Sequence, residues 1–214
     1  MSRGLGDVYK RQMKFSLYNV LSSLLHGFVL LYVVFHMFSI EINDKAILFY
    51  TAIAYFLGFF INTLSSWIEP LYFWCWGGKP SNKLLDGNSR LTGIKLYQAD
   101  VIKNHLKSDV GNGGQQQSND CLFSIAKRKA GETNRISDLN GMYAFSRGLL
   151  TLSFVLSALL ISKFYFCWWS YVICIITIVI LNIRSRQFAY YYSREVYTTY
   201  LTVKETQPKI KTMQ

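Results

Sequence analysis

Four apolar stretches, arranged as two pairs around a polar middle, dominate the hydrophobic pattern of the chain. The first two, residues 17–40 and 46–68, contain no Asp, Glu, Lys or Arg over 24 and 23 residues. A helix needs about 20 apolar residues to cross roughly 30 Å of hydrocarbon. The length and uniformity of both stretches therefore predict membrane-spanning helices rather than core helices of a soluble domain.

The second pair of stretches carries charge at its edges. Residues 148–162 are uncharged, but a helix of that length covers only about 22 Å. Residues 142–145 extend this span if Arg147 keeps its aliphatic stem in lipid and turns its guanidinium toward the headgroups. Residues 165–183 make the fourth span, and Trp168 and Trp169 near its start are typical of a membrane interface.

The predicted fold class is an all-α membrane protein in which two transmembrane helical hairpins, four spans in all, flank a small helical cytoplasmic domain. The hairpins comprise residues 13–68 and 142–183, the domain comprises residues 69–141, and residues 184–214 form a basic and aromatic helix with a tail. Residues 2–12, SRGLGDVYKRQ, look like translated sequencing-adapter sequence. Residues 1–12 are therefore set aside as an artefact, and Met13 is the expected start.

Basic residues set the expected orientation of the spans. The hairpin turns hold one lysine each, Lys45 and Lys163, whereas eighteen other basic residues after residue 12 flank the spans on the opposite side. Short loops rich in Lys and Arg resist translocation. We expect a multi-pass protein of the bacterial inner (plasma) membrane, with both termini and the central domain in the cytoplasm.

The middle of the chain is patterned for helices rather than for a plain linker. A first amphipathic helix is predicted from apolar residues at three- and four-residue steps, namely Leu91, Ile94, Tyr97, Val101 and Ile102. Residues 111–119, GNGGQQQSN, predict a flexible connector. Residues 121–130 predict a second short helix, and residues from 132 onward predict one helix that continues into the third span.

The segment after the fourth span mixes arginines with many aromatic residues. Residues 184–203 either continue the fourth helix into the cytoplasm, where it packs on the central domain, or bend onto the inner leaflet. Pro208 and the polar tail are expected to end the ordered structure.

The composition agrees with a membrane protein, and the positive charge indicates which partners to expect. The chain is 51% hydrophobic and carries a formal net charge of +11. Besides the lipid bilayer itself, the basic run Lys127, Arg128 and Lys129 favours anionic lipid headgroups over nucleic acid as its partner. A homo-oligomer or a cytoplasmic protein partner is expected for the central domain.

Polar residues in the second span form a narrow face. Asn62, Ser65, Ser66 and Glu69 recur at steps of three and four, so they share one side of the cytoplasmic half of the helix. The face could line a pore or substrate path, but a helix-packing seam is the favoured interpretation because the face covers only two turns.

Other candidate residues lie in the first and third spans. Glu69 and Arg147 are expected at similar depth, where they form an ion pair unless Arg147 extends unpaired toward the headgroups. His26 lies near the middle of the first span, where a neutral imidazole bonded to a neighbouring helix is favoured over a proton relay. Ser153 and Ser157, small residues four apart, permit close helix approach in the third span.

No enzymatic chemistry is predicted. The chain has neither a GxSxG elbow nor an HExxH helix, and its four cysteines show no metal-ligand spacing. Residues 77–81, GGKPS, lack the leading glycine of a phosphate loop and predict a turn that leaves the bilayer. No catalytic residue, metal or cofactor is therefore assigned.

Three segments are similar to small multi-pass bacterial membrane proteins associated with antiviral defence and retron loci. They are NTLSSWIEPLYFWCWGGKPSNKLL from residue 62, LFSIAKRKA from residue 122 and NRISDLNGMYAFSRGLLT from residue 134. The resemblance implies an effector whose hairpins damage the inner membrane after a cytoplasmic trigger. We therefore expect a regulated membrane module whose cytoplasmic helices sense a partner or oligomerise. The alternative is a small transporter or channel subunit that uses the polar face of the second span.

Overall fold

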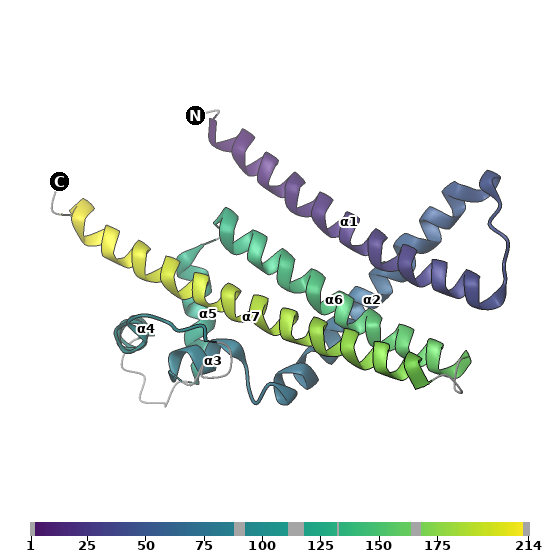
Figure 1. Cartoon of the computed structure of the whole chain (residues 1–214). Helices are drawn as coiled ribbons and strands as arrows, with labels where there is room; N and C mark the ends of the chain where they lie inside the picture. The colour runs from purple at the N-terminus through teal and green to yellow at the C-terminus, as the bar shows by residue number, and fades with distance from the viewer. Residues whose placement is uncertain (1–2, 88–92, 111–117, 132, 164–167, 212–214) are drawn as a thin grey trace. The chain divides into compact units, whose positions relative to one another are not determined.

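The structure, a computed structural model, is all-helical over the residues it describes, which are 3–87, 93–110, 118–131, 133–163 and 168–211 (Figure 1). The order of elements along these residues is α1 (Arg3–Phe38), the 3₁₀ turn η1 (Asp44–Ala46), α2 (Ile47–Cys75), α3 (Pro80–Leu85), α4 (Ala99–Val110), α5 (Asn119–Ala130), α6 (Asn134–Lys163) and α7 (Trp168–Lys211). The all-α fold class is therefore confirmed for the described part of the chain.

Four helical segments are long and apolar enough to cross a membrane. They lie within Val20–Phe38, Asp44–Leu85, Asn134–Lys163 and Trp168–Thr206. Each is longer than the roughly 18 residues that a span requires. The chain thus has the length and composition of a multi-pass helical membrane protein.

The chain divides into two compact units. The membrane unit comprises residues 1–70 and 141–185, and the small-helix unit comprises residues 71–140 and 186–214. Because the divisions fall inside α2, α6 and α7, each of these three helices contributes residues to both units.

Small residues bring α1 and α2 into backbone contact in the membrane unit. A Cβ atom added to Gly27 would lie 1.6 Å from the carbonyl oxygen of Ala54, and one added to Gly58 would lie 1.6 Å from that of Ser23. Ser23 and Gly27 are four residues apart on α1, as are Ala54 and Gly58 on α2. This is the small-xxx-small arrangement that lets membrane helices approach closely.

The rest of the membrane unit is sparsely buried. A small apolar cluster joins Leu30 of α1, Ile61 of α2 and Leu152 of α6. Large apolar side chains elsewhere on the spans are exposed, for example Phe56, Phe60 and Trp67 on α2 and Ile176 and Ile180 on α7. Exposed apolar side chains of this size suit contact with lipid.

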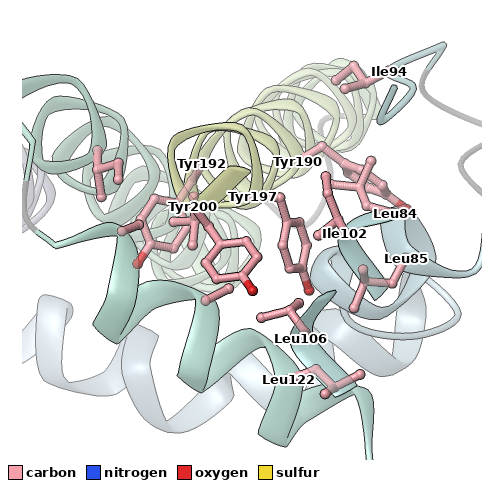
Figure 2. Close-up of a cluster of buried hydrophobic side chains, with 14 residues drawn as sticks. Leu84, Leu85, Ile94, Ile102, Leu106, Leu122, Tyr190, Tyr192, Tyr197 and Tyr200 are labelled. Atoms are coloured by element: carbon pink, nitrogen blue, oxygen red, sulfur yellow. The ribbon is translucent and has the colours of Figure 1, made fainter. Parts of the chain in front are cut away.

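The small-helix unit has a core of its own, built where α3, α4 and α5 pack on the second half of α7 (Figure 2). In Figure 2 the rings of Tyr197 and Tyr200 project from α7 toward these helices. Ile102, Leu106 and Leu122 are fully buried against them. Aromatic residues therefore supply much of the apolar surface that holds the short helices together.

The fourth helix continues beyond the membrane span rather than bending at its end. Helix α7 runs without interruption from Trp168 to Lys211, and its second half carries Tyr190, Val196 and Tyr197 into the core of the small-helix unit. The helix therefore continues and packs on the short helices, as the first of the two alternatives predicted, whereas its location in the cytoplasm stays a prediction. The expectation that order ends at Pro208 was wrong, because the helix extends three residues further.

The predicted helix in the middle of the chain starts later than expected. Helix α4 begins at Ala99, so the prediction was wrong for Ile94 and Tyr97, and Leu91 lies outside the described residues. Gln98 has φ +59, a left-handed conformation that turns the chain just before the helix. Tyr97 consequently leaves the apolar face and is 85% exposed, whereas Ile94 is still buried.

Two further predictions concern the connector at residues 111–119 and the turn at residues 77–81. Most of the flexible connector, residues 111–117, lies outside the described residues, but Asn119 is the first residue of α5 and Ser118 caps that helix by accepting a hydrogen bond from the Cys121 amide. The predicted turn at residues 77–81 is present, with Gly77 and Gly78 at φ +74 and +127 between α2 and α3, whereas its exit from the bilayer stays a prediction.

Candidate functional site: a polar seam between membrane helices

Polar side chains from α1, α2 and α6 meet inside the membrane unit and form what we call the polar seam. Its members are Ser23, His26, Asn62, Ser66, Glu69, Tyr143 and Arg147. Asn62 and Ser66 are four residues apart in α2, and Glu69 is three residues further on, so all three lie on one side of that helix. The predicted polar face of the second span therefore points at neighbouring helices.

An ion pair in the seam joins α2 to α6. An Arg147 terminal nitrogen lies 2.6 Å from a Glu69 carboxylate oxygen, and the two side chains are only 12% and 27% exposed. Tyr143 donates its hydroxyl proton to the other Glu69 oxygen at 2.7 Å, and Arg147 also donates to the Ser66 hydroxyl at 3.0 Å. Of the two arrangements considered for Arg147, the structure thus contains the ion pair.

Both charges in this pair have several polar neighbours. The guanidinium carbon of Arg147 lies 5.3 Å from the centre of the Tyr143 ring, over its electron-rich face. Charge-assisted hydrogen bonds are about twice as strong as neutral ones. Removing either charge would leave the other with little solvation, because both lie at partly buried positions.

A second set of contacts joins α1 to α2 and α6. The Asn62 side-chain amide donates to the Ser23 hydroxyl at 2.8 Å. A Cβ added to Gly148 would lie 2.8 Å from the Asn62 side-chain oxygen and 2.9 Å from the His26 ring. Three helices therefore converge here, and glycine at position 148 leaves the room that His26 and Asn62 occupy.

His26 is fully buried at this convergence. Its ring is 0% exposed and packs against Phe145, with ring centres 5.1 Å apart. Neither ring nitrogen makes a hydrogen bond of normal geometry within the described residues, although the carbonyl groups of Ser22 and Phe145 lie nearby. The hydrogen bond to a neighbouring helix that was favoured for this histidine is thus not formed with normal geometry.

The remaining predicted residues lie in the membrane unit but outside these contacts. Ser65 is buried and its hydroxyl donates to the carbonyl of Asn62 in the same helix. Ser153 and Ser157 are both buried on α6. Ser153 donates to the Leu150 carbonyl of its own helix.

Two members of the seam, Ser23 and Tyr143, were not predicted from the sequence. Ser23, like the glycines of the α1–α2 contact, Gly27 and Gly58, could have been found from the small residues four apart in the first two spans. The sequence did not indicate that Tyr143 bonds to another helix, because an aromatic residue at the end of a span is typical of the membrane interface in any case. Its role depends on the position of Glu69, which only the packing of α6 on α2 determines.

A second polar cluster lies in the small-helix unit around Asp109. Lys204 and Lys129 lie 2.8 Å and 3.0 Å from its carboxylate oxygens, and Tyr200 donates a hydrogen bond to it. Burial opposes ionisation, but hydrogen bonds from Lys204, Tyr200 and Lys129 outweigh it and hold the pKa of Asp109 well below its usual range. The cluster ties α4 and α5 to α7 through a permanent negative charge.

The side chains of the two clusters were also compared with the ligand sets that metal ions require. Among the residues that the structure describes, no three His, Cys, Asp or Glu side chains are grouped closely enough to hold a metal ion. The seam instead pairs donors with acceptors across three helices, an arrangement that fixes helices relative to one another.

Comparison with known proteins gives no relative on which to base a function. No protein-family model matches the chain, and neither the curated proteins nor the solved structures contain a match.

Proposed function

We propose that the protein is a regulated membrane module, an effector whose small-helix unit binds a partner or another copy of the chain and whose membrane helices then rearrange and perturb the bilayer. The observation that carries this proposal is the continuity of α2, α6 and α7 through both units. A helix shared by two units transmits a change in one of them to the other without any further connection.

The position of the Glu69–Arg147 ion pair supports this proposal. Glu69 directly precedes Pro70, which lies inside α2 at the division between the two units. Proline cannot donate the backbone hydrogen bond to the residue four positions earlier, so the helix is weakened at this point. A partner that bends α2 here would strain the ion pair, and its loss would release α6 from α2.

The experiment that tests the effector proposal is a measurement of membrane potential in cells induced to express the chain, with a voltage-sensitive dye. Wild type is expected to depolarise the cells, whereas Leu106→Asp, which places a charge in the core of the small-helix unit, is expected to leave the potential intact. Val101→Asp on an exposed position of the same helix is the matched control and should retain the effect. An intact potential with wild type expressed in the membrane would refute the proposal.

The second candidate function is a small transporter or channel subunit, and the polar seam is the observation that favours it. Polar side chains inside a span are expensive and often mark a substrate or ion path. Flux through liposomes that contain the purified chain, abolished by Glu69→Gln, would support this function. Flux that is unchanged in Glu69→Gln would exclude a path through the seam. The effector is preferred because most seam donors and acceptors are already bonded to one another.

A further inference from the structure

His26, on α1, is a buried titratable side chain in the packing of α1, α2 and α6. The residue is 0% exposed. Its ring centre lies 5.1 Å from that of Phe145, and a Cβ atom added to Gly148 would lie 3.0 Å from its Nε2 atom. Neither ring nitrogen has a hydrogen-bond partner of normal geometry among the described residues. Since buried polar groups are nearly always bonded, this exception requires an explanation.

The contacts of His26 suit a neutral imidazole rather than an imidazolium. From α2 the nearby group is the uncharged amide of Asn62, whose Oδ1 atom would lie 2.8 Å from the same added Cβ atom and whose nitrogen donates to Ser23. A protonated ring would carry two N–H donors, and the acceptors near it are the backbone carbonyl groups of Ser22 and Phe145. A buried positive charge without a carboxylate partner is costly.

The charged groups of the seam do not offset a positive charge on His26. Residues 17–40, 46–68 and 148–162 contain no acidic residue. Glu69 lies seven residues beyond Asn62, about 10 Å along the axis of α2, and it is already bonded to Arg147 and Tyr143. Arg147 directly precedes Gly148 in α6, so its own positive charge would repel an imidazolium.

We propose that protonation of His26 releases the packing of α1 against α2 and α6, so that acid opens the membrane unit. In the closed arrangement the ring is neutral. When the helices separate, water reaches the ring, and a proton from the aqueous phase binds to the lone pair of its unprotonated nitrogen. Because only the open arrangement gains this proton, acid shifts the population toward it. The inference does not depend on the effector function, since it concerns a response to protons and not to a partner.

The pH range of this response follows from the ordinary titration of histidine. An imidazole in water is half protonated near pH 6.5. Above that pH the ring is neutral in both arrangements, and the packing has its full stability. Below it, the ratio of open to closed chains should rise by up to about tenfold for each pH unit. Carboxylates in water titrate near pH 4, so a change between pH 7.5 and pH 5 points to histidine.

The test is thermal unfolding of the purified full chain in a neutral detergent between pH 7.5 and pH 5. The melting temperature of wild type should fall as the pH drops below about 6.5. His26→Gln has no ring to protonate, so its melting temperature should fall much less. His36→Gln removes an exposed histidine of the same helix and should behave as wild type. An equal fall in His26→Gln and wild type would overturn the proposal.

A second variant keeps the test decisive if His26→Gln does not fold. The chain has three histidines, so replacing both His36 and His105 with glutamine leaves His26 alone. This double variant should retain the acid sensitivity of wild type. Loss of the sensitivity in the double variant would show that it comes from another histidine, and the proposal would fail.

A carboxylate placed beside His26 separates titration of the ring from a purely structural role. Asn62→Asp introduces a negative charge at a side chain that already lies close to the ring, so an imidazolium would gain a partner. The fall in melting temperature between pH 7.5 and pH 5 should then be smaller than in wild type. A fall as steep as that of wild type would contradict the proposed effect of charge at His26.

Discussion

Two glycines, Gly27 and Gly58, determine how closely the first two spans approach each other. At Gly27 the position of a Cβ atom is already occupied by the backbone carbonyl of Ala54, and backbone cannot move aside as a flexible side chain can. Adding atoms to such a contact forces the helices apart and breaks the packing around Ser23 and Asn62.

We expect Gly27→Ala to destabilise the membrane unit by about 1–3 kcal/mol, the usual cost of overpacking. The measurement is thermal unfolding in detergent micelles. Ala52→Leu, at an exposed position of α2, adds more atoms but meets no neighbouring helix and is the matched control. Equal melting temperatures for wild type and Gly27→Ala would contradict the backbone contact.

The Glu69–Arg147 pair can be tested at the same scale with a double-mutant cycle. Because both side chains are largely buried, we expect a coupling energy of about 1–3 kcal/mol between Glu69→Gln and Arg147→Gln. The measurement is the unfolding midpoint of the four proteins of the cycle in detergent.

An exposed ion pair of the same chain is the control for this cycle. Arg135 lies 3.3 Å from Glu195, but its side chain is 70% exposed, so solvent screens the attraction. The corresponding cycle should give less than about 1 kcal/mol. Similar coupling energies in the two cycles would show that burial does not strengthen the Glu69–Arg147 pair.

At the scale of elements, the small-helix unit depends on α4 and α5 being held against α7. Asp109 makes this contact with side chains from two helices, Lys129 of α5 and Lys204 and Tyr200 of α7. Its folded pKa lies below its unfolded value because these hydrogen bonds outweigh the cost of burial. The stability that it contributes is therefore present above an unfolded pKa of about 3.9 and is lost as the pH falls through the folded pKa.

We expect Asp109→Asn to lower the stability of the small-helix unit by about 1–3 kcal/mol at pH 7, the range for losing hydrogen bonds to a charged group. The difference between wild type and variant should shrink as the pH falls below about 4. Urea unfolding followed by tyrosine fluorescence at pH 7 and pH 3 measures both values. Asp100→Asn, an exposed carboxylate of the same helix, should leave the midpoint unchanged at pH 7.

The elements themselves were predictable from the sequence to different degrees. The four spans follow from long uncharged stretches, since the cost of burying backbone in lipid allows little but helices there. The start of α4 was not predictable, because the apolar spacing of Ile94 and Tyr97 continues through Gln98, where the backbone turns. The spacing of apolar residues shows which side chains can share one face of a helix, but it does not show where a turn in the backbone begins or ends that helix.

The polar seam shows the same limit at the level of the site. The face of Asn62, Ser65 and Glu69 could be predicted from spacing within one helix. Its partners on other helices are Ser23 and Tyr143. Which residues become partners depends on how deep each span lies and how it is rotated about its axis, and the periodicity of one helix does not give either quantity. His26 lies in α1, as expected, but its contacts with Phe145 and Gly148 depend on the packing of α6, a separate helix.

At the scale of the whole molecule, the shared helices α2, α6 and α7 make orientation in the membrane the property on which the proposed function depends. Basic residues are concentrated in the small-helix unit and its flanks, whereas the turn between the first two spans holds Lys45 alone. From the positive-inside rule we expect the small-helix unit to face the cytoplasm, and this orientation stays a prediction.

Cysteine labelling tests this orientation with residues that the chain already has. Cys121, on α5, is a free and exposed thiol. In a variant that keeps only this cysteine, a membrane-impermeant maleimide should label inverted membrane vesicles and leave intact cells unlabelled. A cysteine introduced at Glu41, an exposed position between the first two spans, should give the reverse pattern. Labelling of Cys121 from outside would place the small-helix unit where no cytoplasmic partner could reach it, and the regulated-effector proposal would then lose its mechanism.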